Sequence, residues 1–255
     1  MKRTILLLIF TFSAIPNTIV AQGTSQLGTP HPSPQTFTGE TLFAALLEHN
    51  LSRDSRLHDF SVQRTYVVKD NKNKPRAESE VLFSYRAPDR KEFSIISEKG
   101  SGFVRKRVFK AILESEVETA SGKSDRDSSI SPANYSFELL GEEDVDGFHT
   151  FVVHAMPKRN DKYLFEGKVW IEATEFAILR IEGQPAKSPS FWIKKVNWVR
   201  RYERIDGFWL PLKDETVTEV RLIGKNTFTI DHGNYEINRT SAVNNETIQT
   251  TAHVR

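Results

Sequence analysis

Histidines have the widest chemical range of the side chains in this sequence, since they can bind metals or transfer protons near neutral pH. His149 and His154 lie five residues apart in a stretch that alternates like a β-strand. They would point to opposite faces and could not share a metal ion. His232 stands between Asp231 and Gly233, a combination typical of a solvated hairpin turn. None of these positions predicts a catalytic or metal site.

A run of acids before Gly147 could supply the general acid and base of a hydrolase if its surroundings separated two pKa values. The run consists of Glu142, Glu143, Asp144 and Asp146. It falls at an expected hairpin turn and lacks the apolar surroundings that raise a carboxyl pKa, so we interpret it as solvated. Its spacing also differs from that of a calcium-binding EF-hand loop.

Other catalytic signatures are absent from the sequence. It contains no nucleophile elbow, no glycine-rich phosphate loop and no cysteine. We therefore expect no enzyme activity, no cofactor and no metal. Without a cysteine the chain also cannot carry the lipid of a bacterial lipoprotein or depend on disulfides for stability.

Two groups of basic side chains could contact an anionic partner such as a lipid head group, or could be solvated surface. They are Arg105, Lys106, Arg107 and Lys110, and Lys194, Lys195, Arg200, Arg201 and Arg204. The sequence leaves this choice open.

The elements that position these side chains follow an expected export signal. Residues 1–21 combine a basic start at Lys2 and Arg3, an apolar stretch too short to span a membrane, and small residues up to Ala21. We expect cleavage after Ala21, a periplasmic location and a disordered linker over residues 22–38. Loss of Lys2 and Arg3 takes the formal net charge from +2 to zero, so nothing favours nucleic acid binding.

Helical periodicity occurs twice. Residues 39–51 place Leu42 and Leu46 on one stripe, with Thr38 and Thr41 available as caps. Residues 107–120 place Phe109 and Leu113 on one stripe. In the second segment the charged residues are expected to face away from the sheet. They are Lys110, Glu114, Glu116 and Glu118.

Ten segments alternate or run apolar between turn signals, as antiparallel strands do. They are residues 60–68, 78–85, 91–96, 135–140, 148–156, 167–173, 177–183, 192–205, 209–220 and 227–237. Residues 121–131 are expected to form a mobile loop and residues 239–255 a polar tail. The pattern predicts one α+β domain over residues 39–238, with successive strands paired in a meander.

The second half of the chain is rich in aromatic side chains, which core packing alone could partly explain. A strongly curved antiparallel sheet with helices in its hollow also leaves a concave apolar face, and such faces hold apolar ligands. An apolar ligand is therefore the binding hypothesis that the pattern favours.

Four segments resemble the LolA-like outer-membrane lipoprotein-sorting proteins, in particular an uncharacterised branch from acidobacteria. They are residues 134–141, which read NYSFELLG, residues 157–171, which read PKRNDKYLFEGKVWI, residues 176–183, FAILRIEG, and residues 202–211, YERIDGFWLP. The resemblance implies an unclosed, strongly bent half barrel of about ten strands, with two helices covering its concave apolar face.

The same resemblance implies a periplasmic carrier that binds acyl chains of a lipoprotein or lipid without catalysis. It implies an inner-membrane transporter and an outer-membrane acceptor as partners, only transient membrane contact, and an arginine that latches the cover, which no motif identifies here. The candidate lining residues are Leu42, Leu46, Phe83, Phe93, Phe109, Leu113, Trp170, Trp198, Tyr202 and Trp209. Two alternatives are a regulatory sensor module that binds a protein partner and a lipidated signal, and a hydrolase without recognisable motifs.

Overall fold

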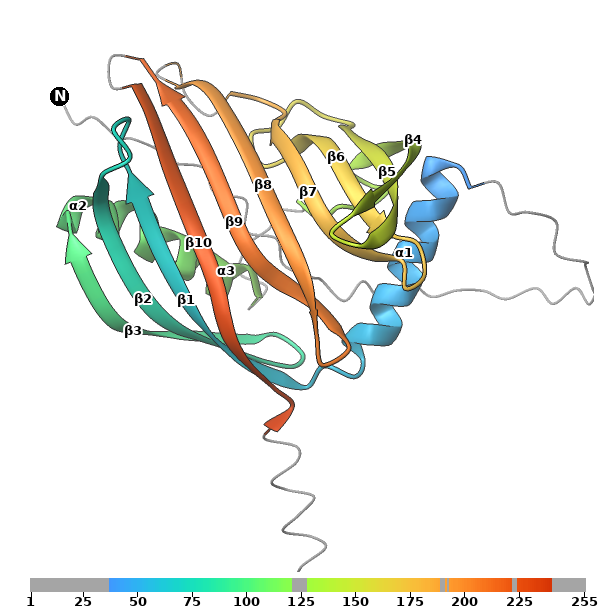
Figure 1. Cartoon of the computed structure of the whole chain (residues 1–255), viewed down its shortest axis with the longest axis horizontal. Coiled ribbons are helices and arrows are strands. Elements are labelled where there is room, and N and C mark those ends of the chain that lie inside the picture. Colours follow the sequence, from blue (N-terminus) through green and yellow to red (C-terminus); the bar gives the residue numbers. More distant parts are fainter. Residues whose placement is uncertain (1–36, 121–127, 189–190, 192, 222–223, 240–255) are drawn as a thin grey trace, which may run out of the picture.

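The fold is one ten-stranded antiparallel sheet with helical segments against it (Figure 1). The computed structural model describes residues 37–120, 128–188, 191, 193–221 and 224–239. Its helical elements are α1 (Gly39–Asp54), α2 (Gly102–Val104), the π-helical turn η1 (Arg105–Phe109) and α3 (Lys110–Ala120). Its strands are β1 (Asp59–Lys69), β2 (Pro75–Arg86), β3 (Arg90–Gly100), β4 (Tyr135–Val145), β5 (Phe148–Pro157), β6 (Phe165–Glu172), β7 (Ala177–Pro185), β8 (Ile193–Ile205), β9 (Phe208–Val220) and β10 (Gly224–Ile237).

The strands follow the order β3-β2-β1-β10-β9-β8-β7-β6-β5-β4, so two meanders are joined where β10 pairs with β1. The edge strands β3 and β4 do not pair with each other, and the curved sheet stays open (Figure 1). The predicted α+β half barrel is therefore confirmed, and each of the ten predicted strands is present. The tight turn at Asp146 and Gly147 has positive φ at both residues, as a twisted hairpin requires.

Both helical segments are longer than predicted. Thr38 caps α1 by accepting a hydrogen bond from the Thr41 amide, and the helix continues three residues beyond the expected end at Leu51. The second segment starts at Gly102 rather than at residue 107, because Ser101 supplies a cap that accepts from the Val104 amide at 3.4 Å. The expected stripes of apolar residues remain on the inner side.

One register row crosses the whole sheet and shows that α1 and α3 lie on the same face. In an antiparallel sheet, directly paired residues point to the same side. The row is Leu139, Val153, Val169, Ile181, Arg200, Asp214, Ile230, Tyr66, Ser79 and Glu98. Ile181 belongs to the cluster that contains α1, and Tyr66 belongs to the cluster that contains α3. Both helices therefore pack on the concave face.

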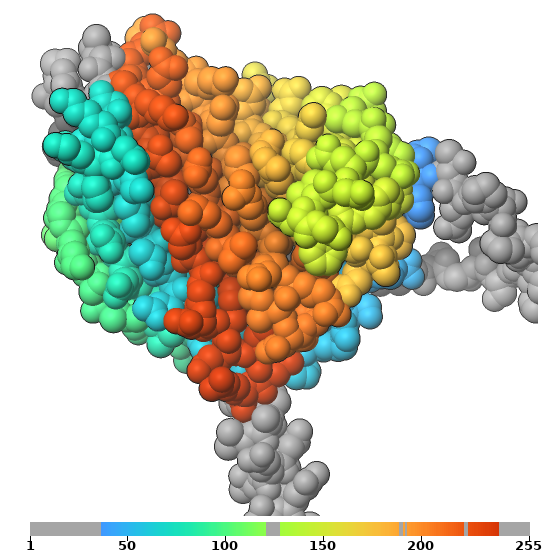
Figure 2. All heavy atoms as spheres, in the orientation of Figure 1, coloured from blue at the N-terminus to red at the C-terminus, as the bar shows by residue number. Residues whose placement is uncertain are grey.

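Two separate apolar clusters fill that face. The α1 cluster packs this helix on β4–β8, and the α3 cluster packs η1 and α3 on β1, β2 and β10. A third, smaller cluster contains Val152 and Trp170, which pair with each other one residue out of phase with Val153 and Val169. It therefore lies on the outer face, across which β10, β9 and β8 run uncovered (Figure 2).

The expected signal peptide at residues 1–21 lies outside the described residues. The same holds for residues 22–36 of the expected linker, residues 121–127 of the expected loop, and the tail from residue 240 onward. Between residues 37 and 239, the described part of the chain contains no helix long and apolar enough to cross a membrane.

Candidate functional site

The predicted lining residues divide between the two apolar clusters of the concave face. Leu42, Leu46 and Trp198 are in the α1 cluster, with Tyr202 packed against it. Phe83, Phe109 and Leu113 are in the α3 cluster, with Phe93 packed against it. Each helix occupies the place in which we expected an apolar ligand.

Trp170 and Trp209 are placed elsewhere. They belong to the outer-face cluster, where the Trp209 indole donates a hydrogen bond to Glu175 Oε2 at 2.7 Å and the Trp170 indole donates to Glu143. Strand alternation puts Trp170 on the opposite side from Val169 and Ile171. We therefore leave both tryptophans out of the lining proposed below.

A charged seam, which we define as Arg64, Lys91, Glu116, Arg200, Asp214 and His232, separates the two clusters. On the sheet, Arg200 Nε donates to Asp214 Oδ1 at 2.5 Å, and His232 Nε2 lies 3.0 Å from Asp214 Oδ2. All three side chains are less than 10% exposed. An acid shared by a guanidinium and an imidazole is satisfied on both oxygens, which is what a buried carboxylate requires.

The second part of the seam joins the sheet to α3. Arg64 Nη1 of β1 donates to both carboxylate oxygens of Glu116, at 3.0 and 3.2 Å. The side chains are 7% and 14% exposed, and the Arg64 guanidinium also stacks over the Phe83 ring at 3.6 Å. This ion pair is therefore a buried attachment between α3 and the strand beneath it.

The electrostatic surroundings keep both carboxylates of the seam ionised. Burial alone would raise the pKa of Asp214, but Arg200 and the hydrogen bond from His232 outweigh it and lower that pKa. Burial also opposes ionisation of Glu116, whose pKa is nevertheless lowered by Arg64 and Lys91. Burial lowers the pKa of His232 and outweighs the hydrogen bond with Asp214, which raises it, so the ring stays neutral.

Two interpretations of the sequence were wrong at the seam. His232 is not a solvated turn residue: it lies inside β10 opposite Arg64, and the adjacent Gly233 belongs to a register irregularity rather than to a turn. Glu116 does not face solvent, because Arg64 lies beneath α3 and receives it. An acid on a helix and an arginine on a distant strand carry no signal in the sequence that they will meet.

The acids and histidines at the other positions form local pairs. His149 lies within 3.1 Å of Glu142 and Asp144, and His154 lies 3.7 Å from Glu166. Among the residues that the structure describes, no three His, Asp or Glu side chains converge as metal ligands would. The predicted turn at Asp146 and Gly147 is confirmed, although the four residues before Asp146 continue β4.

Helix α1 is fastened at both ends. Near its start, the Glu40 carboxylate accepts a hydrogen bond from the Phe137 amide of β4 at 3.0 Å. Near its end, the Arg53 guanidinium donates to the main-chain oxygens of Glu175 and Phe176 at 2.5 and 3.1 Å. These contacts fix the ends of the helix, while its middle is held by apolar packing.

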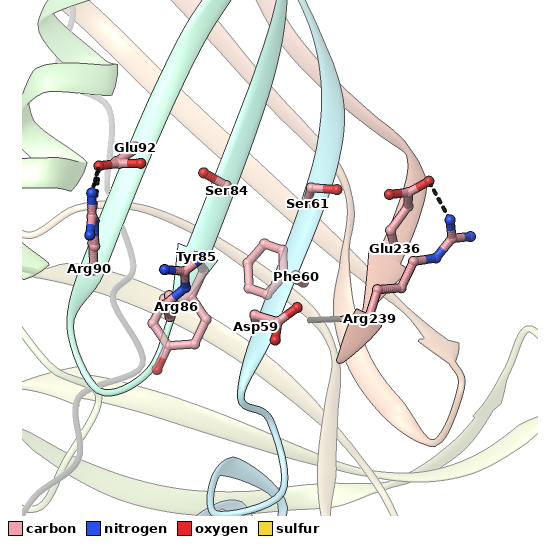
Figure 3. A pocket seen from close by; sticks show the side chains of 10 residues that line it. All are labelled: Asp59, Phe60, Ser61, Ser84, Tyr85, Arg86, Arg90, Glu92, Glu236 and Arg239. Atoms are coloured by element: carbon pink, nitrogen blue, oxygen red, sulfur yellow. Dashed lines mark hydrogen bonds and ion pairs between the residues drawn. The ribbon is translucent and has the colours of Figure 1, made fainter. Parts of the chain in front are cut away.

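Two surface depressions lie away from the charged seam. One, of about 160 Å³, is at the end of β1–β3 and β10, where Arg90 pairs with Glu92 and Arg239 with Glu236 (Figure 3). The other, of about 510 Å³, is over the middle of β5–β8 and includes His154 and Lys168 from the outer face. The first is smaller than ordinary ligand pockets. Its Arg90–Glu92 and Arg239–Glu236 side chains are already paired with each other.

The His232→Gln variant is expected to weaken the dependence of stability on pH between pH 7 and 5. The pKa of His232 is lowered in the folded state, so below about pH 6.5 the unfolded chain takes up a proton that the folded chain does not. Stability is therefore complete above that pH and falls as the pH drops through the folded-state pKa. Urea unfolding at several pH values measures this.

Comparison with the unmodified protein cancels the opposite contribution of exposed His149, whose pKa is raised by its hydrogen bond to Asp144. Asp214 and Glu116 titrate only at lower pH, since their pKa values are lowered. Equal slopes in the two proteins would mean that His232 is not buried and neutral.

Comparisons with known proteins return resemblances of fold. A family model described only as an uncharacterized protein matches residues 119–243, and no curated protein matches the chain. A DUF1329 family protein from Desulfovibrio piger is 16% identical, with 80% of this chain and 95% of that chain covered and a TM-score of 0.42. A LolA superfamily protein from Nitrosomonas europaea is 11% identical, with 79% and 94% covered and a TM-score of 0.40. Both solved structures are similar to this chain at low sequence identity.

Proposed function

We propose that this protein is a periplasmic, non-catalytic carrier that shields the acyl chains of a lipoprotein or lipid on the concave face of its sheet. Its partners would be a transporter in the inner membrane and an acceptor in the outer membrane. The lining would comprise the eight predicted residues that lie in or against the two concave-face clusters.

The observation that carries this proposal is the pair of helices on the concave face of an open sheet, each with an apolar cluster of its own. Leu42 and Leu46 of α1, Phe109 of η1 and Leu113 of α3 are at most 2% exposed. The sheet residues beneath them belong to the same two apolar clusters. An acyl chain that replaced a helix stripe would bury the same kind of surface, at a gain of about 0.8 kcal/mol for each CH₂ group.

Loading requires a helix to move, because both clusters are closed in this structure. The Arg64–Glu116 pair holds α3 on β1 and is the contact that must break for α3 to leave. We therefore propose Arg64 as the arginine that latches the cover. The ends of α1 are tied by hydrogen bonds to the main chain, which makes α3 the better candidate for the moving helix.

Native mass spectrometry of residues 22–255, purified from periplasm without detergent, tests the proposal. A carrier should show discrete added masses that solvent extracts as acyl lipids or lipopeptides, in substoichiometric and exchangeable amounts. A clean mass with no uptake of offered lipids would contradict it. Steady consumption of the lipid would instead show catalysis.

Leu46→Glu and Leu113→Glu are expected to abolish lipid retention, because each places a carboxylate among apolar side chains where an ionised acid is strongly unfavourable. Matched controls are Ala44→Glu and Ala111→Glu, which add the same side chain to exposed positions of α1 and α3. Circular dichroism and bound lipid are measured together. If the two Leu variants fold and retain lipid like their controls, the lining is wrong.

One observation favours the second candidate, a sensor module that binds a protein partner. Among the described strands, the edge strand β3 pairs with β2 alone, and Ile95, Ile96 and nearby Phe103 are 44%, 56% and 54% exposed. An exposed apolar edge can accept a strand from another chain. Recovery of one partner at a fixed ratio, with no lipid in any preparation, would favour this candidate over the carrier.

A further inference from the structure

We propose that the charged seam is a binding site for an anionic group, phosphate or carboxylate, of an amphiphilic ligand, and that the Glu116 carboxylate occupies this site while α3 is closed. This inference rests on the proposed function and adds the chemical class of the cargo. It starts from the position of the Glu116 carboxylate among the cations of the sheet.

Three cations favour the ionised form of that carboxylate. Arg64 contacts it directly at 3.0 Å, and Lys91 and Arg200 are close enough that both favour its ionised form. These cations belong to three different strands, β1, β3 and β8. An anion placed there is attracted by all three charges in surroundings of low dielectric constant, where such attraction is strong.

The two carboxylates of the seam lie on different elements. Asp214 lies on β9 and stays with its partner Arg200 whatever the helices do. Glu116 lies on α3 and would leave with that helix. If an acyl chain then took the place of α3, the Arg64 guanidinium would be buried without its counterion, a state that costs several kcal/mol. A ligand that supplies its own anion removes this cost, whereas a neutral ligand does not.

Arg64 also has unused hydrogen-bonding capacity. Both oxygens of Glu116 accept from the single atom Nη1, and Arg64 Nε is buried without a partner among the described residues. Phosphate and carboxylate groups bind arginine best through two parallel hydrogen bonds from neighbouring nitrogens. The helix carboxylate therefore fits the guanidinium less well than a freely positioned anion would.

The seam lies between the apolar clusters, which matches the shape of an amphiphile. Arg200 is flanked in its register row by Ile181 of the α1 cluster, and Arg64 is bordered by Phe83 of the α3 cluster. An anionic group bound at the seam would place attached acyl chains directly on apolar surface.

The test compares ligands of matched chain length by isothermal titration: palmitic acid, palmitoyl lysophosphatidic acid and neutral monopalmitoylglycerol. In the unmodified protein, both anionic ligands should bind about tenfold to a hundredfold more tightly than the neutral one, as charge-assisted hydrogen bonds imply. Glu116→Gln should raise this ratio further, because the competing carboxylate is gone. Glu114→Gln, on the exposed side of the same helix, is the control and should leave the ratio unchanged.

Arg64→Met should bring the ratio to about one. If that variant does not fold, Arg64→Met combined with Glu116→Gln gives the same readout, since it leaves no buried carboxylate without a partner. A ratio near one in the unmodified protein, or a ratio that none of these substitutions changes, would overturn the anion site while leaving the carrier intact. Failure of all three lipids to bind would instead contradict the carrier itself.

Inorganic phosphate is added as a fourth ligand to separate a lipid head group from a free anion. We expect it to bind far more weakly than lysophosphatidic acid, because it gains nothing from the apolar clusters. Equal affinity for the two would show that the site takes a free anion, and would overturn the assignment to an amphiphile.

Discussion

Replacing Asp214 with Ala is expected to lower the free energy of unfolding by about 3–5 kcal/mol, because removal of one partner leaves a buried charge without compensation. Asp214 accepts from Arg200 at 2.5 Å and contacts His232 at 3.0 Å, and all three side chains are buried. The substitution removes the carboxylate that the Arg200 guanidinium contacts directly. Chemical denaturation measures the loss.

Two further variants separate the buried pair from the general effect of losing a charge. Arg201→Met removes an exposed cation from the next position of β8 and should change stability by less than about 0.5 kcal/mol. Arg200→Met combined with Asp214→Leu should recover most of the loss, since well-packed apolar side chains often replace a buried ion pair without cost. A small loss in Asp214→Ala would mean that solvent reaches the seam.

The architecture could be predicted from the sequence because local patterns specify it. Alternation and turn residues identify each strand, and the dipeptides at Asp146 and Asp206 adopt the positive φ values that tight hairpins need. The stripes at Leu42 and Phe109 also orient the two helices correctly. These signals act over a few residues, so they survive without knowledge of the tertiary structure.

The charged seam could not be predicted, because it depends on contacts between residues far apart in the chain. Arg64 meets Glu116 across 52 positions and meets His232 through the pairing of β1 with β10. Charged residues are usually exposed, and the sequence patterns accordingly predict solvated positions for Glu116 and His232 and leave the position of Arg200 open. One signal was present: Arg200 lies between Trp198 and Tyr202 on the same face of β8, where a solvated arginine would be unusual.

Gly167→Ala is expected to cost about 3 kcal/mol or more, because no space exists for even one methyl group. A Cβ at this position would lie 1.9 Å from the main-chain oxygen of Glu182 and 2.5 Å from Gly183 Cα, so β6 and β7 would have to separate. Overpacking against main chain cannot be relieved by a rotamer change. Thermal unfolding of the variant measures the effect.

Gly233→Ala is the matched control, since a Cβ there meets nothing within 4 Å and the glycine is also in a strand. It should be neutral or slightly stabilising, because alanine restricts the unfolded chain more than glycine does. Gly167 and Gly183 lie beside Trp198 in one register row. The difference in stability between the two variants tests whether close approach of β6 and β7 requires glycine there. Main chain without side chains leaves room for the edge-to-face contact of Trp198 with Phe165, two members of the α1 cluster whose ring centroids lie 5.7 Å apart. If both variants were equally stable, close approach of β6 and β7 would not be what requires glycine there.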